Sequence, residues 1–139
     1  MQLMTQTDPN ELKAALREKN INPTIQRLAI LECLRSTRSH PTVEEVKKMV
    51  EARLPMISTA TVYNVLNNFE KNGLARAISV HRNSPQRFDG DLSPHHHLFE
   101  DSSQSLIDIP IESVSIDPKI LEQYNISGVE IILKGVKRA

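Results

Sequence analysis

The chain has 139 residues, and its 17 Lys and Arg balance its 17 Asp and Glu, so its formal net charge is zero. This length fits one domain or two small ones. The sequence contains no run of 18 apolar residues and no secretory signal segment, and its single cysteine, Cys33, excludes an intramolecular disulfide framework and a cysteine-rich zinc site. We therefore expect a cytoplasmic protein that does not enter a membrane, with Cys33 as small core filling.

Charge is unevenly distributed along the chain. Residues 1–88 carry 13 Lys and Arg against 8 Asp and Glu, whereas residues 89–139 carry 4 against 9. A basic front part favours an approach to phosphate, and an acidic rear part favours the binding of a cation. The charge pattern thus indicates two parts with different functions.

Four helices are predicted in the front part. They begin at Asp8, Thr24, Thr42 and Ser58, and the second covers Ile25–Leu34. The first and third starts also have a glutamate at the spacing of a capping box. The predicted buried stripe of the third helix consists of Val43, Val46, Met49 and Val50.

The helix that begins at Ser58 and ends at Gly73 has two different faces. Its predicted core face consists of Val62, Val65, Leu66 and Phe69. Its other face carries neutral hydrogen-bonding side chains, which suit base edges and phosphates in a major groove. These side chains are Thr61, Tyr63, Asn64 and Asn67.

A β-hairpin is predicted directly after this helix. It consists of strand Leu74–Val80, a turn at His81–Pro85 and a short strand Gln86–Phe88. Helices followed by such a hairpin are the plan of a winged helix, which places its last helix in the major groove. A helical scaffold without a role in DNA binding is the alternative.

Three adjacent histidines, His95–His97, form the strongest metal-binding pattern. Imidazoles bind zinc, iron, manganese and nickel. In a helix, His95 and His97 would point to different sides, whereas in a strand they share one face. The sequence HHHLFE, then polar DSSQ, then SLIDIP predicts two strands and a tight turn.

The position of this turn determines which residue faces the histidines. If the turn centres between Ser102 and Ser103, antiparallel pairing places Asp108 opposite His97. A carboxylate then joins two imidazoles on one face. We interpret this arrangement as a metal site, and a solvated histidine cluster on a polar surface strand is the alternative. Further along, a short helix Pro118–Tyr124 and a final strand Val129–Val136 are predicted.

Several segments together resemble the ferric uptake regulator (Fur) family of metal-dependent repressors. They are PTIQR at 23–27, RSHPTVEEV at 38–46, ISTATVYNVLNNFEKNGL at 57–74, QRFDG at 86–90, and HHHLFE with the LID that ends at 108. The resemblance implies an α+β fold: an N-terminal winged-helix DNA-binding domain at 1–85, followed by a small α/β metal-binding dimerisation domain at 86–139. It also implies a homodimer that binds a palindromic operator in double-stranded DNA.

The resemblance further implies one regulatory ion between the two domains. Its implied ligands are His40, Asp89, His95, His97 and Asp108. The expected ion is Fe(II) or Mn(II), with Zn(II) as a further candidate in vitro. Because both domains bind it, the ion would restrain the hinge and set the spacing of the two recognition helices. The expected DNA contacts come from Arg27, Ser58, Thr61, Tyr63, Asn64 and Asn67.

The sequence departs from the family pattern in two ways. Many members hold a structural zinc with two Cys-x-x-Cys pairs, but the first pair's positions here are Glu100 and Ser103, and the tail has no cysteine. No structural four-cysteine zinc is therefore expected. In addition, Asp108 resembles the peroxide-sensing branch (PerR), in which bound Fe(II) reacts with hydrogen peroxide and a ligand histidine is oxidised. His40 and His95 are the candidates for this oxidation.

Three other functions stay open. The iron response regulator (Irr) branch shares the histidine run, the missing cysteine pairs and the LIDIP continuation at 106–110. It implies an iron- or haem-responsive regulator in which haem gives His96 a role, although no Cys-Pro haem motif stands near the N-terminus here. The second is a plain iron- or zinc-responsive repressor. From a different class, three histidines and two carboxylates also suit a non-haem metal-binding protein or enzyme.

Overall fold

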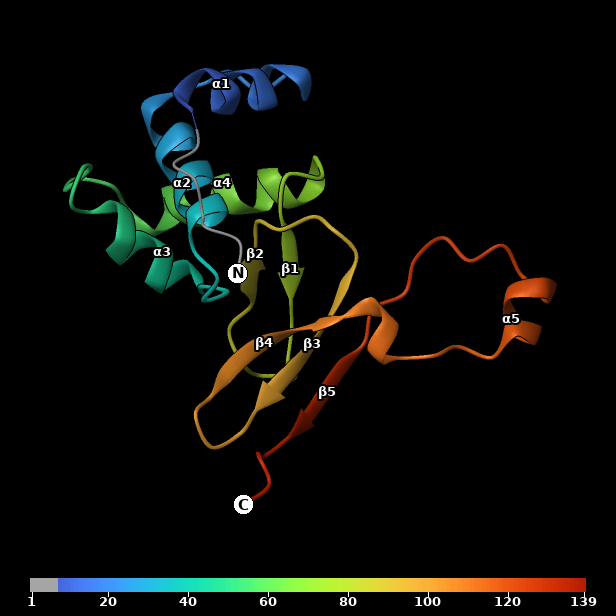
Figure 1. Cartoon of the computed structure of the whole chain (residues 1–139). Coiled ribbons are helices and arrows are strands. Elements are labelled where there is room, and N and C mark those ends of the chain that lie inside the picture. The colour runs from blue at the N-terminus through green and yellow to red at the C-terminus, as the bar shows by residue number, and fades with distance from the viewer. Residues whose placement is uncertain (1–7) are drawn as a thin grey trace. The chain divides into compact units, whose positions relative to one another are not determined.

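The chain forms two compact units in a computed structural model that describes residues 8–139. The first unit ends at Leu92, and the second comprises Ser93–Ala139 (Figure 1). The first contains α1 (Pro9–Glu18), α2 (Ile25–Ser36), α3 (Val43–Val50), α4 (Thr59–Lys71), β1 (Arg76–Ile78) and β2 (Arg87–Asp89). The second contains β3 (His95–Glu100), β4 (Ser105–Pro110), a 3-10 turn (Ile111–Ser113), α5 (Pro118–Gln123) and β5 (Ile132–Gly135). No helix among residues 8–139 is long and apolar enough to cross a membrane.

Local capping determines where the helices of the first unit begin. The side chains of Thr24, Thr42 and Ser58 each accept a hydrogen bond from the backbone N–H three residues later. Such caps satisfy N–H groups that have no partner inside the helix, and each contributes about 1 kcal/mol. At the other end of α4, Asn72 is the C-cap, and Gly73 follows it with a φ of +73°. The predicted cap at Gly73 is therefore one residue too far along the chain, although glycine is well suited to this left-handed position.

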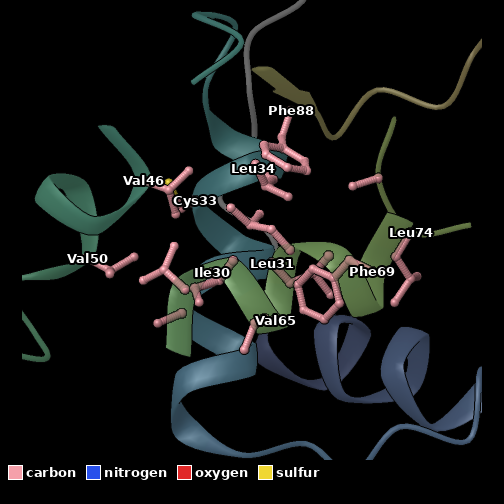
Figure 2. Close-up of a cluster of buried hydrophobic side chains, with 14 of the residues drawn as sticks. Ile30, Leu31, Cys33, Leu34, Val46, Val50, Val65, Phe69, Leu74 and Phe88 are labelled. Atoms are coloured by element: carbon pink, nitrogen blue, oxygen red, sulfur yellow. The ribbon is translucent and has the colours of Figure 1, made fainter. Parts of the chain in front are cut away.

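The core of the first unit lies between the four helices and the hairpin. Figure 2 shows Ile30, Leu31 and Leu34 of α2 packed with Val65 and Phe69 of α4. Phe88 of β2 is also buried in this core. The predicted core face of α4 is confirmed, because all four of its apolar residues are buried. These contacts hold the hairpin against the helices.

Met49 is an exception to the predicted stripe of α3. Val46 and Val50 are buried as expected, but Met49 is 44% exposed. The cause is its place at the edge of the stripe, where its sulfur accepts a hydrogen bond from Cys33 Sγ at 3.4 Å and the rest of the side chain stays at the surface. Burial raises the pKa of the Cys33 thiol to about 11, so this cysteine is unreactive core filling, as predicted.

Two small sheets complete the fold. β1 and β2 pair antiparallel, with Arg76 opposite Asp89. In the second unit, β3 lies between β4, which is antiparallel to it, and β5, which is parallel. The predicted strands at 95–100 and 105–110 are confirmed, and His97 is paired with Asp108 as the turn position implied. The final strand is shorter than the predicted 129–136. The predicted domain boundary after residue 85 stays a prediction; β2, which follows it, pairs with β1 in the first unit.

We expect Phe69→Ala to reduce the free energy of unfolding of the first unit by about 3–5 kcal/mol, because it leaves a cavity at the centre of the core. Urea unfolding followed by far-UV circular dichroism measures this loss. Met56→Ala is the matched control, since Met56 is 93% exposed and its truncation should change the free energy by no more than about 0.5 kcal/mol. Equal losses in the two variants would contradict the assigned core.

Candidate metal centre and nucleic-acid interface

The first unit contains a buried histidine–carboxylate pair. The loop before α3 is hydrogen-bonded to β2: Phe88 N–H donates to the Pro41 carbonyl at 2.9 Å, and Thr42 forms an antiparallel bridge with Arg87. This pairing brings His40 Nε2 to 3.4 Å from Asp89 Oδ2, and both side chains are buried. Residues 49 positions apart in sequence thus present an imidazole and a carboxylate to one point.

The backbone at His40 has an uncommon conformation. Its φ is +52°, in the left-handed region that residues with a side chain adopt rarely. Such a conformation persists only where its surroundings hold it. Here Arg87 Nη1 donates to the His40 carbonyl at 3.4 Å, and the paired backbone on the next two residues fixes the chain direction. This conformation, at a buried histidine beside a carboxylate, makes His40 a candidate functional residue.

Gly90 fixes the position of Asp89 through a close approach. A Cβ atom at Gly90 would lie 2.6 Å from the Leu34 carbonyl oxygen of α2, closer than real Cβ contacts come. The chain therefore passes directly against the α2 backbone just after Asp89. The Asp89 carboxylate also accepts the Asp91 N–H at 2.8 Å. The role of Gly90 was not predicted from the sequence, although a glycine directly after a candidate ligand was visible in QRFDG.

The second unit contains a set of two imidazoles and one carboxylate. His95 and His97 lie on one face of β3, with ring centroids 4.6 Å apart. The Nε2 atom of each lies 3.5 Å from Asp108 Oδ1, on the paired strand β4. Both histidine side chains are almost fully buried, whereas that of Asp108 is 36% exposed. The predicted set is thus brought together, with one side accessible from solvent.

The tautomer of His95 suits a metal ligand. Its Nδ1–H donates to the Ser93 carbonyl at 2.7 Å, so the lone pair of the neutral ring lies on Nε2. A hydrogen bond of this kind orients a ligating imidazole and increases its basicity. His95 Nε2 lies 3.1 Å from His97 Nε2, and such a pair shares either one proton or one cation. The donor set of two nitrogens and one oxygen fits a first-row divalent metal.

His96 lies on the opposite face of β3. It pairs in register with Ile109 and is only 2% exposed. Among the described residues, no group forms a hydrogen bond with its Nδ1. His96 is therefore separate from the set formed by His95, His97 and Asp108, as the two-residue period of a strand requires.

The outward face of α4 is polar and accessible. Ser58, Tyr63 and Asn64 are exposed, and Thr61 and Asn67 are half-buried. Ser58 and Thr61 also form the N-cap, because the Thr61 N–H donates to Ser58 Oγ at 3.1 Å. Arg27 lies on α2 instead, where its guanidinium donates to the Asn22 carbonyl at 2.8 Å. Whether these residues touch DNA stays a prediction.

A helical unit that ends in a β-hairpin, with an exposed polar last helix, defines a winged-helix DNA-binding protein, and the histidine–carboxylate sets are candidate metal ligands. The sequence model described as "Ferric uptake regulator family" matches residues 18–134. The chain therefore belongs to the ferric uptake regulator family.

Individual relatives agree with this assignment. A protein from Bacillus subtilis named peroxide operon regulator is 36% identical over 102 residues, which cover 71% of this chain and 70% of that protein. The peroxide-responsive repressor PerR of Staphylococcus epidermidis is 34% identical over 95 residues, which cover 68% of this chain and 63% of that protein. The structure of a ferric uptake regulator from Pseudomonas aeruginosa with manganese has a TM-score of 0.69 at 22% identity, and the match covers 91% of this chain and 98% of that one.

These comparisons confirm the α+β fold with a winged helix and a dimerisation domain. Members of this family are transcription regulators that bind DNA and form dimers, not enzymes. The alternative of a metalloenzyme is therefore wrong. Solved members bind metals, including manganese and iron, and the fold thus agrees with a metal-responsive regulator.

We expect Gly90→Ala to weaken Mn(II) binding by about tenfold or more, because the added methyl group would push the Asp89 backbone away from α2 and misplace the carboxylate. Isothermal titration calorimetry on the full chain measures the affinity. Gly128→Ala is the control, since a Cβ there meets no atom within 4 Å. An unchanged affinity in the Gly90 variant would show that this close approach does not position a ligand.

Proposed function

We propose that this chain is a metal-dependent repressor that senses hydrogen peroxide in the cytoplasm through oxidation of a ligand histidine. The observation that carries the proposal is the meeting of His95 and His97 with an aspartate, Asp108, on one accessible site. An aspartate at this position is the residue that the resemblance associates with the peroxide-sensing branch of the family. The identity to proteins named as peroxide regulators supports the same branch.

We propose further that one ion is bound by both histidine–carboxylate sets. The set of the first unit offers one imidazole and one carboxylate, and the set of the second offers two imidazoles and one carboxylate. Neither set alone fills the five or six coordination positions that Fe(II) and Mn(II) commonly take, whereas both together supply five ligands. Fe(II) is the proposed sensing ion, Mn(II) a non-sensing corepressor, and Zn(II) a further ligand in vitro.

In this proposal the chain's own residues hold and orient the site. A bound Fe(II) would activate hydrogen peroxide: as the O–O bond breaks, one oxygen would insert into a C–H bond of the His40 or His95 imidazole, and the other would leave as water. Ser93 holds the His95 ring with its Nε2 atom 3.5 Å from Asp108 Oδ1, and β2 holds His40 beside Asp89. Oxidation of His40 or His95 removes a ligand from the set. The remaining ligands would bind the ion more weakly, and its loss would remove the proposed stabilisation of the DNA-binding form.

We propose that two copies of the chain bind operator DNA together. A palindromic operator has two half-sites, and a homodimer presents one α4 helix to each. The second unit has exposed apolar side chains that suit dimerisation, including Ile120, Leu121 and Tyr124 around α5. Figure 1 shows that α5 extends away from the three-stranded sheet of its own unit. Burial of these side chains against a second copy would stabilise the dimer.

An Irr-like function with haem at the histidine run receives less support. Haem would have to reach His96, whose side chain is buried within the described residues. A planar macrocycle cannot contact a buried imidazole unless the surrounding strands move. A plain iron- or zinc-responsive repressor uses the same ligands, and the response to peroxide distinguishes it from the proposed sensor.

We expect dilute hydrogen peroxide to add oxygen to His40 or His95 in the Fe(II)-loaded protein. The same treatment should release the Fe(II)-loaded protein from operator DNA. Mass spectrometry of peptides and a gel shift with a promoter palindrome measure the two effects. The Mn(II)-loaded protein is the control and should keep both its mass and its DNA. Asp108→Glu should retain metal-dependent DNA binding but oxidise more slowly.

An unmodified Fe(II)-loaded protein that stays bound to DNA after peroxide treatment would refute peroxide sensing. If removal of iron alone then released the DNA, the chain would be a plain iron-responsive repressor.

We expect Asn64→Ala or Tyr63→Ala to weaken operator binding by about 1–3 kcal/mol while Mn(II) affinity stays unchanged, because these side chains lie on the exposed face of α4. Fluorescence anisotropy with labelled operator measures binding. Asn125→Ala is the matched control, since Asn125 is exposed in the second unit. Loss of metal affinity with intact operator binding would overturn the assignment of α4.

A further inference from the structure

Glu100, at the end of β3, has an unusually complete set of hydrogen bonds. Its Oε1 accepts from Ser102 Oγ at 2.5 Å and from the Lys137 backbone N–H at 3.3 Å. Its Oε2 accepts from the Ser103 N–H at 2.7 Å and from Ser103 Oγ at 2.6 Å. A carboxylate has about four lone-pair sites. The donors therefore use its full accepting capacity in a residue that is only 8% exposed.

The donors come from two different segments of the second unit. Ser102 and Ser103 belong to the turn between β3 and β4, whereas Lys137 follows β5 near the end of the chain. Glu100 also stands in register with Ser105 of β4 and with Gly135 of β5. Its carboxylate thus joins both neighbours of the central strand at one point.

We propose that Glu100 is a metal-free anchor that ties the β3–β4 turn and the C-terminal segment to the ligand strand β3. It stands where the resemblance places the first cysteine of a structural zinc pair, and Ser103 stands at the second. A buried carboxylate that accepts several short hydrogen bonds cross-links segments as a bound ion does, without requiring an ion. The second unit accordingly keeps this junction when all metal is removed.

The neighbouring backbone supports the same junction. The Asp101 N–H donates to the Gly135 carbonyl at 2.9 Å, which extends the β3–β5 pairing past the end of the strand. Gln104 closes the turn with a φ of +56°, and its side-chain amide donates to the Asp101 carbonyl at 2.7 Å. The turn therefore has the shape that presents both serine hydroxyls to the carboxylate.

The ionisation of Glu100 agrees with an anchor that works at neutral pH. The hydroxyl of Ser102, followed by the hydroxyl and N–H of Ser103, lowers the pKa of Glu100 to about 2, although burial opposes this. A carboxyl group whose pKa is lowered in the folded protein contributes its full stabilisation at any pH above its ordinary pKa of 4.5. This contribution is lost as the pH falls through the folded-state pKa of about 2. The carboxylate is thus charged, and the hydrogen bonds are intact, throughout the neutral range.

Amide hydrogen exchange, followed by NMR on the full chain after exhaustive treatment with a chelator, tests the anchor directly. The Ser103 and Lys137 amides should stay protected in the metal-free wild type. Glu100→Gln keeps one accepting oxygen but places an NH2 group against the other donors, so it should accelerate exchange at one or both amides by about tenfold or more. Glu112→Gln, on the exposed 3-10 turn, is the matched control and should leave both amides protected.

Two results would overturn the proposal. One is loss of protection at these amides in the wild type on chelation, because the junction would then depend on metal. The other is unchanged protection of both amides in Glu100→Gln. If that variant unfolds, Ser103→Ala replaces it: the pKa of the Glu100 carboxyl, titrated by NMR, should then rise from about 2 toward 4.5. An unchanged pKa in Ser103→Ala would equally contradict the anchor.

Discussion

The antiparallel pairing of β3 with β4 is the constraint on which the candidate metal centre depends. Because side chains alternate between the two faces of a strand, pairing His97 with Asp108 places His95, His97 and the aspartate on one face and His96 on the other. A slip of one residue would reverse every one of these positions. The polar turn at 101–104 prevents that slip, since Glu100 accepts hydrogen bonds from both of its serines. Ligand geometry in this unit is therefore a consequence of register.

The first unit brings its two candidate ligands together by a different device. His40 belongs to a loop, and a loop residue is positioned only as well as its backbone is held. Pairing of that loop with β2 and the close approach of Gly90 to α2 provide the support. In this arrangement the His40 backbone has a left-handed conformation, which costs about 1–3 kcal/mol of strain. The large apolar core around Phe69 and Phe88 stabilises the unit enough to tolerate this strain.

Local and periodic features were predictable from the sequence, and close tertiary approaches were not. Helix caps at Thr24, Thr42 and Ser58 follow from residue type and spacing, and the β3–β4 register follows from where the polar turn falls. The exposure of Met49 and the requirement for glycine at position 90 depend on how α3 and α2 pack, which no short pattern encodes. The sequence showed Glu100 in place of a cysteine but left its role open, since its hydrogen bonds depend on a turn and on a segment 37 residues away.

The anchor at Glu100 bears on how a regulatory ion can be released. An ion that also holds the fold together cannot leave without unfolding the protein, so its loss is coupled to a large free energy. In the second unit, hydrogen bonds from Ser102, Ser103 and Lys137 join the three strands at one end, while His95, His97 and Asp108 lie toward the other. Structural support and the proposed ion binding therefore involve different side chains of the same sheet. Under the proposed function, a fold held by Glu100 leaves the free energy of ion binding available for the change between DNA-binding and released forms.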